Sequence, residues 1–183
     1  AKGLLKLTVT QKQTGDAVPK TYHFPMTFTV VTEEGEQAIT LPVAERTRTW
    51  AIPMEATPTR VEVDPGFKFL SNMTVEGSRQ LLIASLKGDA GVVGRIRAAK
   101  ALAKEGSPIA VDALADALKT ESFWGVRSEI ARLLGKNGTA AARKALLACI
   151  DDEHAKARGP IVAALGELPT HPDIIEASTA IAK

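Results

Sequence analysis

A repeat in the second part of the chain is the feature that most limits how the protein can fold. Three ten-residue segments align without gaps at spacings of 32 and then 31 residues, namely 94–103, 126–135 and 157–166. Each has an arginine at its second position and a leucine at its ninth, with apolar residues at helical spacing between them. A helix pair that repeats at this period cannot bury its apolar face alone, so it must stack on its neighbours. The repeat predicts an α-solenoid.

The residues between these segments predict where the second helix of each unit begins. Ser107, Thr139 and Thr170 follow the three segments, and serine and threonine commonly cap helix N-termini. Pro108 stands at the first helical position after Ser107, where proline is favoured. The segment 79–87 aligns with a second helix whose first helix is absent, so we expect it to pack against the preceding domain.

The first part of the chain alternates between apolar and polar residues, as strands with one buried face do. The pattern recurs in five short segments: 5–10, 24–30, 39–43, 50–52 and 61–63. Turn-forming residues separate several of them, at 14–16, 33–36 and 64–66. This arrangement predicts a small antiparallel β-sandwich.

The composition changes where the strand pattern gives way to the helical repeat. Residues 1–75 hold 13 of the 17 threonines, whereas residues 76–183 hold 23 of the 29 alanines. Threonine favours strands and alanine favours helices. We therefore predict two domains, an all-β sandwich over 1–75 and an all-α helical repeat domain over 76–183.

Every unit of the repeat also carries an acidic residue six positions before an arginine. The three pairs are Asp89 and Arg95, Glu121 and Arg127, and Asp152 and Arg158. They could form a charged binding stripe, or a structural ladder in which each arginine binds the acid of its own or the adjacent unit. We favour the ladder, because exposed ion pairs stabilise little while partly buried ones fix geometry.

Charge and hydropathy exclude several classes of partner. The formal net charge is +2 and both halves are near neutral, so no nucleic-acid surface is indicated. No apolar run approaches the roughly 18 residues that a membrane span needs. The single Cys149 excludes an internal disulfide and, with no signal peptide visible, favours the cytoplasm. The chain begins with Ala1 rather than methionine, and we interpret it as part of a longer protein.

Catalytic chemistry is not indicated in this segment. The sequence lacks a His-Glu-x-x-His helix motif, a nucleophile elbow, a Walker loop and a dinucleotide-binding glycine pattern. Its histidines, at positions 23, 154 and 171, are too far apart to suggest a metal cluster. We therefore assign no catalytic, cofactor-binding or metal-binding residue here, and expect His154 to be a solvated residue in a turn between helices.

Two further features have both a structural and a functional interpretation. Cys149 lies among apolar residues and is more plausible as a buried thiol than as a nucleophile. Phe123 and Trp124 begin the middle unit and could anchor an interface or fill the core between stacked repeats. We favour the core, because tryptophan is usually largely buried.

The acid-to-arginine recurrence and the Leu-Gly or Leu-Ala end of each first helix resemble HEAT repeats of the short bacterial type. The resemblance covers residues 76–183. It implies a stacked helical solenoid, and it leaves the function open, since HEAT solenoids bind many kinds of partner.

The order of the two domains resembles the region after the catalytic domain in aminopeptidase N-like zinc metallopeptidases, the gluzincins. The resemblance rests on five stretches: Leu5–Gln13, Tyr22–Phe28, Trp50–Pro53, Val61–Gly66 and Phe123–Glu129. It implies a parent zinc exopeptidase that removes N-terminal residues from peptides. The zinc ligands and the amine-binding strand of that family are absent here, so no catalytic residue carries over.

What the resemblance implies for this segment is a supporting role. The segment would lie beside its own upstream catalytic domain, which would hold the zinc, and would shape the access of peptide substrates. The alternative is a HEAT-repeat scaffold or protein-binding module with no peptidase activity. An upstream His-Glu-x-x-His motif followed by a glutamate about 20 residues later would favour the first hypothesis.

Overall fold

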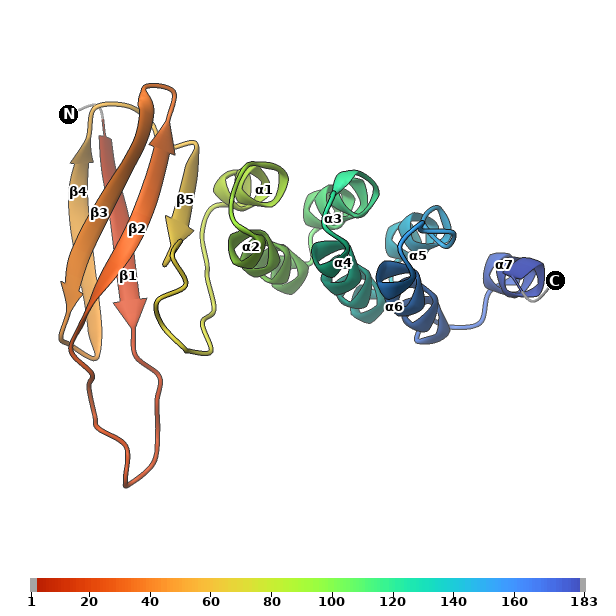
Figure 1. Ribbon diagram of the computed structural model, residues 1–183, viewed down its shortest axis with the longest axis horizontal. Coiled ribbons are helices and arrows are strands. Elements are labelled where there is room, and N and C mark those ends of the chain that lie inside the picture. Colours follow the sequence, from red (N-terminus) through yellow and green to blue (C-terminus); the bar gives the residue numbers. More distant parts are fainter. Residues whose placement is uncertain (1–2, 182–183) are drawn as a thin grey trace. The chain divides into compact units, whose positions relative to one another are not determined.

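The structure, a computed structural model, describes residues 3–181, with five strands followed by seven helices (Figure 1). The chain divides into two compact units between Asn72 and Met73. The first unit holds all the strands and the second all the helices. The predicted fold class, an antiparallel β region followed by stacked helical repeats, is confirmed.

The strands form two antiparallel sheets. β1 (Gly3–Thr10) pairs with β4 (Thr47–Met54) along its whole length. In the second sheet β2 (Phe24–Thr32) lies between β3 (Gly35–Val43) and β5 (Arg60–Val63). In β1, β3 and β4 the less exposed residues alternate with exposed ones, so each of these strands turns one face toward the apolar core of the unit.

The alternation predicted from the sequence decides which side chains enter this core. Leu7, Met26, Phe28 and Val30 are buried, and Val30 is completely shielded from solvent. On an outward face, threonines lie opposite each other and their hydroxyls hydrogen-bond across the strands; Thr8 and Thr49 do so at 2.8 Å.

The helices of the second unit are α1 (Arg79–Lys87), α2 (Val92–Glu105), α3 (Pro108–Thr120), α4 (Trp124–Asn137), α5 (Ala140–Leu147), α6 (Ala155–Gly166) and α7 (Pro172–Ile181). They alternate between two rows, with α1, α3 and α5 in one and α2, α4 and α6 in the other (Figure 1). Neighbours within each row pack on one another, which is the stacking that the repeat predicts. None of the described helices is long and apolar enough to cross a membrane.

Leucines and isoleucines on the inner faces of both rows form one continuous core. Its fully buried members include Leu102, Leu114, Ile130, Leu134 and Leu146. These side chains recur at the three- and four-residue spacings that place them on one helix face. The core therefore runs from unit to unit rather than forming a separate centre in each.

The helix starts predicted from serine and threonine are confirmed in two of three units. The Ser107 and Thr139 side chains accept the backbone N–H groups of Ala110 and Ala142, each at 3.2 Å. The prediction for Thr170 is wrong by one residue. Because α7 begins at Pro172, His171 occupies the capping position, and its Nδ1 accepts the N–H of Asp173 at 3.4 Å.

Candidate functional site: the charged ladder of the repeats

The repeated acids and arginines lie at one end of the row formed by α2, α4 and α6. Each acid stands two residues before the N-cap of its helix, and each arginine is the fourth helical residue. The turn before a helix and its first helical turn are close in space. The repeat register therefore brings charged groups of successive units to one edge.

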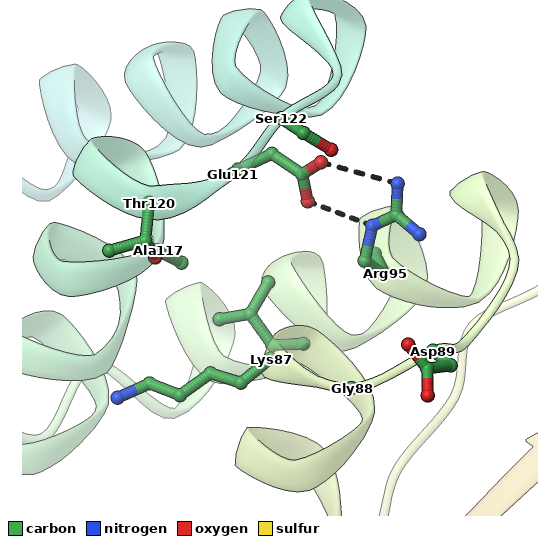
Figure 2. Close-up of a pocket in the computed structure, with 9 residues that line it drawn as sticks. Lys87, Gly88, Asp89, Arg95, Ala117, Thr120, Glu121 and Ser122 are labelled. Atoms are coloured by element: carbon green, nitrogen blue, oxygen red, sulfur yellow. Dashed lines mark hydrogen bonds and ion pairs between the residues drawn. The ribbon is translucent and has the colours of Figure 1, made fainter.

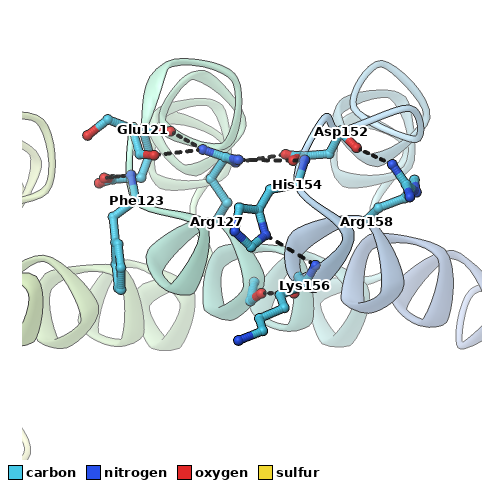
Figure 3. Close-up of polar contacts among 9 residues, drawn as sticks. Glu121, Phe123, Arg127, Asp152, His154, Lys156 and Arg158 are labelled. Carbon is cyan, nitrogen blue, oxygen red and sulfur yellow. Dashed lines mark hydrogen bonds and ion pairs between the residues drawn. The ribbon is translucent and has the colours of Figure 1, made fainter.

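Arg127 and Asp152 form the most buried pair of this ladder (Figure 3). Arg127 Nε donates to Asp152 Oδ2 at 2.7 Å, and its second terminal nitrogen donates to Oδ1 at 2.9 Å. Each side chain exposes only 8% of its surface. This bidentate geometry is the strongest form of a charge-assisted hydrogen bond, and it joins α4 to the turn before α6.

Arg95 and Glu121 repeat this arrangement one unit earlier (Figure 2). Arg95 Nε donates to Glu121 Oε2 at 2.8 Å, and the second contact, to Oε1, measures 3.2 Å. Glu121 is nearly buried, with 6% of its side chain exposed, and Arg95 exposes 17%. In both pairs the arginine binds the carboxylate of the acid in the next unit, not the carboxylate of the acid six residues before it.

Backbone groups of the turns before the helices add hydrogen bonds to both the Arg127–Asp152 pair and the Arg95–Glu121 pair. Arg127 Nη1 donates to the carbonyl oxygens of Glu121 and Ser122, at 2.9 and 3.0 Å. The acids in turn accept an N–H of their own turn: Asp152 accepts that of His154 at 2.9 Å, and Glu121 that of Phe123 at 2.8 Å. Each arginine therefore ties the turn before its own helix to the turn before the next helix.

The charges in this ladder shift the ionisation of its members. Burial alone would raise the pKa of Asp152, but hydrogen bonds from Arg127 and from the His154 N–H, together with the Arg127 charge, hold it below its ordinary value. The hydrogen bonds that Arg127 donates to Asp152 raise the pKa of Arg127 despite the opposing effect of burial. Both groups are thus held in their charged forms near neutral pH.

The two outer members of the ladder are placed differently. Among the described residues, Arg158 donates only to the backbone oxygen of Asp152, at 2.8 Å, and its side chain is exposed. Asp89 is also exposed; Arg95 binds the neighbouring carbonyl of Ala90 instead of the Asp89 carboxylate. The structure thus brings four of the six predicted residues together as two side-chain pairs.

Close approach of helices accompanies the ladder, through residues that no sequence motif singles out. Ser128 Oγ donates to the Lys156 carbonyl oxygen at 2.7 Å, so α4 touches the backbone of α6. A Cβ added at Gly135 would lie 2.9 Å from the Ala164 Cβ, so only glycine permits the observed distance. Small residues at fixed repeat positions are the only signal of this contact in the sequence.

Two shallow depressions lie between the turns of successive units. One, of about 230 Å³, is lined by residues that include Lys87, Asp89, Arg95 and Glu121 (Figure 2). The other, of about 580 Å³, includes Arg127, Cys149 and Asp152. Their arginines are already bound by carboxylates and so are poorly suited to capture an anionic ligand. Over residues 3–181, no three His, Cys, Asp or Glu side chains converge as a metal site would require.

An aromatic cluster lies beside the Arg127 pair. The Trp124 ring stacks on His154, with centroids 5.3 Å apart and planes at 14°, and the Lys156 ammonium lies 5.0 Å from the tryptophan ring. The prediction that Phe123 and Trp124 fill the core is wrong for Phe123, which is 38% exposed, while Trp124 is half-buried. The reason is their position at the start of α4, where side chains reach the edge of the stack.

His154 and Cys149 have structural surroundings. His154 is the N-cap of α6, and its Nδ1 accepts the N–H of Lys156 at 3.3 Å. It is half-buried against Trp124 rather than fully solvated. Cys149 follows α5 and packs against the helical core, where burial raises the pKa of its thiol. A raised pKa disfavours the thiolate and therefore nucleophilic chemistry.

Comparisons with known proteins agree with this architecture. No curated protein matches the sequence. Among solved structures, the chain is similar to Legionella pneumophila aminopeptidase A, solved in complex with aspartic acid, with a TM-score of 0.57 at 13% identity. The likeness covers 98% of this chain but only 27% of the aminopeptidase chain. This chain therefore spans about a quarter of the length of the aminopeptidase. At this identity the likeness shows the fold alone.

The helical unit has a more specific match. The family model that describes HEAT repeats matches residues 79–173, which run from the start of α1 into α7 and make up just over half of the chain. Stacked helix pairs with a recurring acid-to-arginine link fit that match, and the chain belongs to the HEAT-repeat family.

Proposed function

We propose that these residues are a non-catalytic region of a longer, aminopeptidase-like polypeptide. In this proposal they follow a zinc-dependent catalytic domain, support it and limit which peptides reach its active site. The zinc would be bound wholly by the upstream domain, because the described residues of this chain offer no fitting set of ligands. A cytoplasmic location belongs to the same proposal and rests on the single Cys149.

The observation that carries the proposal is the extent of the structural likeness. HEAT repeats occur in proteins of many functions, so the helices alone would not favour a peptidase. The similarity to the aminopeptidase covers 98% of this chain, and therefore includes the β unit as well as the helices. A small sandwich followed directly by a helical stack is a less common combination than either part.

The ladder gives this region the stiffness that a supporting role requires. Arg95 and Arg127 connect three successive units through nearly buried carboxylates. Links of this kind resist sliding of one helix past the next, because a displaced unit would leave a charge unpaired. A stiff stack could hold a fixed position beside an active site and exclude long substrates.

The sequence of the parent polypeptide is the first test. The proposal requires a His-Glu-x-x-His motif before the sandwich, with a glutamate about 20 residues further on as the third zinc ligand. Its presence supports the proposal. A parent polypeptide without these ligands contradicts the peptidase assignment.

One observation favours the second candidate, a protein-binding scaffold without peptidase activity. Phe123 is 38% exposed beside the half-buried Trp124, and aromatic residues are enriched at the centres of protein interfaces. HEAT repeats suggest protein interaction in general. A parent that binds a protein partner, lacks zinc ligands and loses binding on Phe123→Ala would favour this candidate.

A further inference from the structure

Four basic residues lie together on the outer side of α2 and α4. Lys100 and Lys104 are one helical turn apart on α2, and Arg132 and Lys136 hold the equivalent positions on α4. All four side chains are exposed. Because α2 and α4 pack on one another in the same row, the four residues form one surface, which we call the basic patch.

Glu129 connects the two halves of this patch. Its carboxylate lies 3.3 Å from Lys100 Nζ, and its other oxygen lies 3.4 Å from Arg132 Nη1. This one carboxylate is therefore shared by a cation of α2 and a cation of α4. Its position shows that the basic residues of the two helices are neighbours in space as well as in repeat register.

The carboxylates at the patch do not balance its positive charge. Lys100 and Arg132 share Glu129, and Lys104 pairs with Glu76 at 2.6 Å, where both side chains are largely exposed. Within residues 3–181, Lys136 meets no carboxylate. The patch therefore keeps an excess of positive charge, although the whole chain is close to neutral.

The stacking of the helices does not explain these cations. The positions on α6 equivalent to Arg132 and Lys136 hold Ala163 and Glu167, so the repeat does not require basic residues there. The helix dipole favours a cation in the last turn, which accounts for Lys136 but not for Arg132 one turn earlier. Part of the patch thus has no structural reason within the stack.

We propose that the basic patch is a docking surface for an acidic segment of a separate protein. The two cations on each helix are one turn apart, so carboxylates one turn apart on a bound helix match their spacing. Such carboxylates would give Lys136 a partner and would compete with Glu76 for Lys104. Because the pairs are exposed, the binding is weak, reversible and sensitive to salt.

The position of Glu129 favours a protein segment over a nucleic acid. Proteins that bind nucleic-acid strands use a continuous basic groove, often with exposed aromatic side chains on which bases stack. Here a carboxylate lies between the cations of the two helices and would repel a phosphate backbone that crosses it. A protein segment can instead place an uncharged or basic residue opposite Glu129 and its acidic residues opposite the cations.

Fluorescence anisotropy of a labelled peptide tests the proposal without any peptidase assay. The probe is a short peptide of glutamate and alanine, with the glutamates one helical turn apart, and its control has glutamine in place of each glutamate. We expect the 183-residue chain to bind the glutamate peptide at low salt and to lose it as salt is added. No binding at low salt, or equal binding of the glutamine peptide, would overturn the proposal.

A pair of double variants shows where the peptide binds. Lys104→Gln with Lys136→Gln should weaken binding about fivefold, since each removes one exposed ion pair. The matched control is Lys119→Gln with Lys144→Gln, which removes the same charge from exposed residues of α3 and α5. The control should have little effect. Equal weakening by the two double variants would show general charge attraction and contradict the proposed site.

Glu129 provides a test in the opposite direction. Glu129→Gln removes the carboxylate that Lys100 and Arg132 share, so both cations become available to the peptide. We expect binding to tighten about two- to fivefold. Asp112→Asn, an exposed acid of α3, changes the net charge equally and should have little effect. Unchanged or weaker binding with Glu129→Gln would contradict the proposal.

Three further probes distinguish the other possible occupants. A labelled single-stranded oligonucleotide or vesicles of anionic lipid that bind the patch more tightly than the peptide would overturn the choice of a protein partner. The parent polypeptide is tested with the same peptide. If the parent does not bind it while the 183-residue chain does, a segment of the parent covers the patch, and the separate partner is wrong. Binding by both proteins supports the proposal.

Discussion

Arg127 in α4 holds Asp152 of the next unit through two hydrogen bonds of 2.7 and 2.9 Å, with 8% of each side chain exposed. The two residues are 25 positions apart, so their link connects successive units and not neighbouring turns of one helix. Arg95 and Glu121 repeat it one unit earlier. The stacking of the solenoid thus has a polar as well as an apolar component.

Loss of the Arg127 side chain should destabilise the helical unit. Arg127→Ala leaves the Asp152 carboxylate buried without its main donor, and we expect a cost of about 1–3 kcal/mol in unfolding free energy. Arg132 is the matched control, because its side chain is 58% exposed and pairs only with Glu129 among the described residues. Arg132→Ala should cost less than about 1 kcal/mol. Urea unfolding of both variants measures the difference, and equal losses would show that the ladder has no structural role.

The Asp152 pair should also make stability depend on acid pH. The pKa of Asp152 is lowered in the folded state, so its contribution is complete above the unfolded value of about 3.9 and is lost as the pH falls through the lower folded value. Asp152→Asn should therefore lower the melting temperature at about pH 7. The gap from the wild type should narrow below about pH 4. A gap that stays constant down to about pH 2.5 would contradict this assignment.

Gly135 should tolerate no larger side chain. An added Cβ would lie 2.9 Å from Ala164 Cβ and 3.1 Å from its backbone, so the two helices would have to separate. We expect Gly135→Ala to cost about 1–3 kcal/mol of stability, although alanine is the better helix former. Gly166→Ala, at the equivalent position of α6 with nothing within 4 Å, should be neutral or stabilising. Calorimetry on the two variants would detect opposite shifts, and two shifts of the same sign would argue against tight packing at Gly135.

The predicted boundary between the domains should be a site of proteolysis. Residues 71–78 form no helix or strand, and Leu70 just before them is fully exposed. Limited digestion with proteinase K should cut first between Ser71 and Gly77 and leave a resistant helical fragment, identified by mass spectrometry. First cuts inside the repeats would contradict the division into 1–75 and 76–183.

The sequence predicted the helical repeats closely because local and non-local signals agreed. Segment 79–87 is recognisable as a helix by register alone, and α1 has those bounds. Ser107 and Thr139 cap helices as expected because their hydroxyls need only a neighbouring N–H. The cap before α7 lies at His171 because Pro172, and not the threonine, sets the first helical position.

Which acid each arginine of the ladder binds could not be predicted from the sequence. A six-residue spacing suggested that each acid could meet its own arginine. The structure instead places Arg95 against Glu121, because a stacked helix brings the next turn closer than the preceding one. The exposure of Phe123 was missed for a related reason: the hydropathy of a residue does not reveal that a helix start lies at the rim of a stack.

The most direct test of the supporting-domain account compares the 183-residue chain with its parent polypeptide in two measurements. Metal analysis reports bound zinc, and release of arylamine from aminoacyl-arylamides reports aminopeptidase activity. The account predicts a parent that binds zinc, hydrolyses these substrates and loses activity to a chelator. It predicts that the isolated chain neither binds zinc nor hydrolyses the substrates. Zinc-dependent turnover by the isolated chain, or a metal-free and inactive parent, would contradict it.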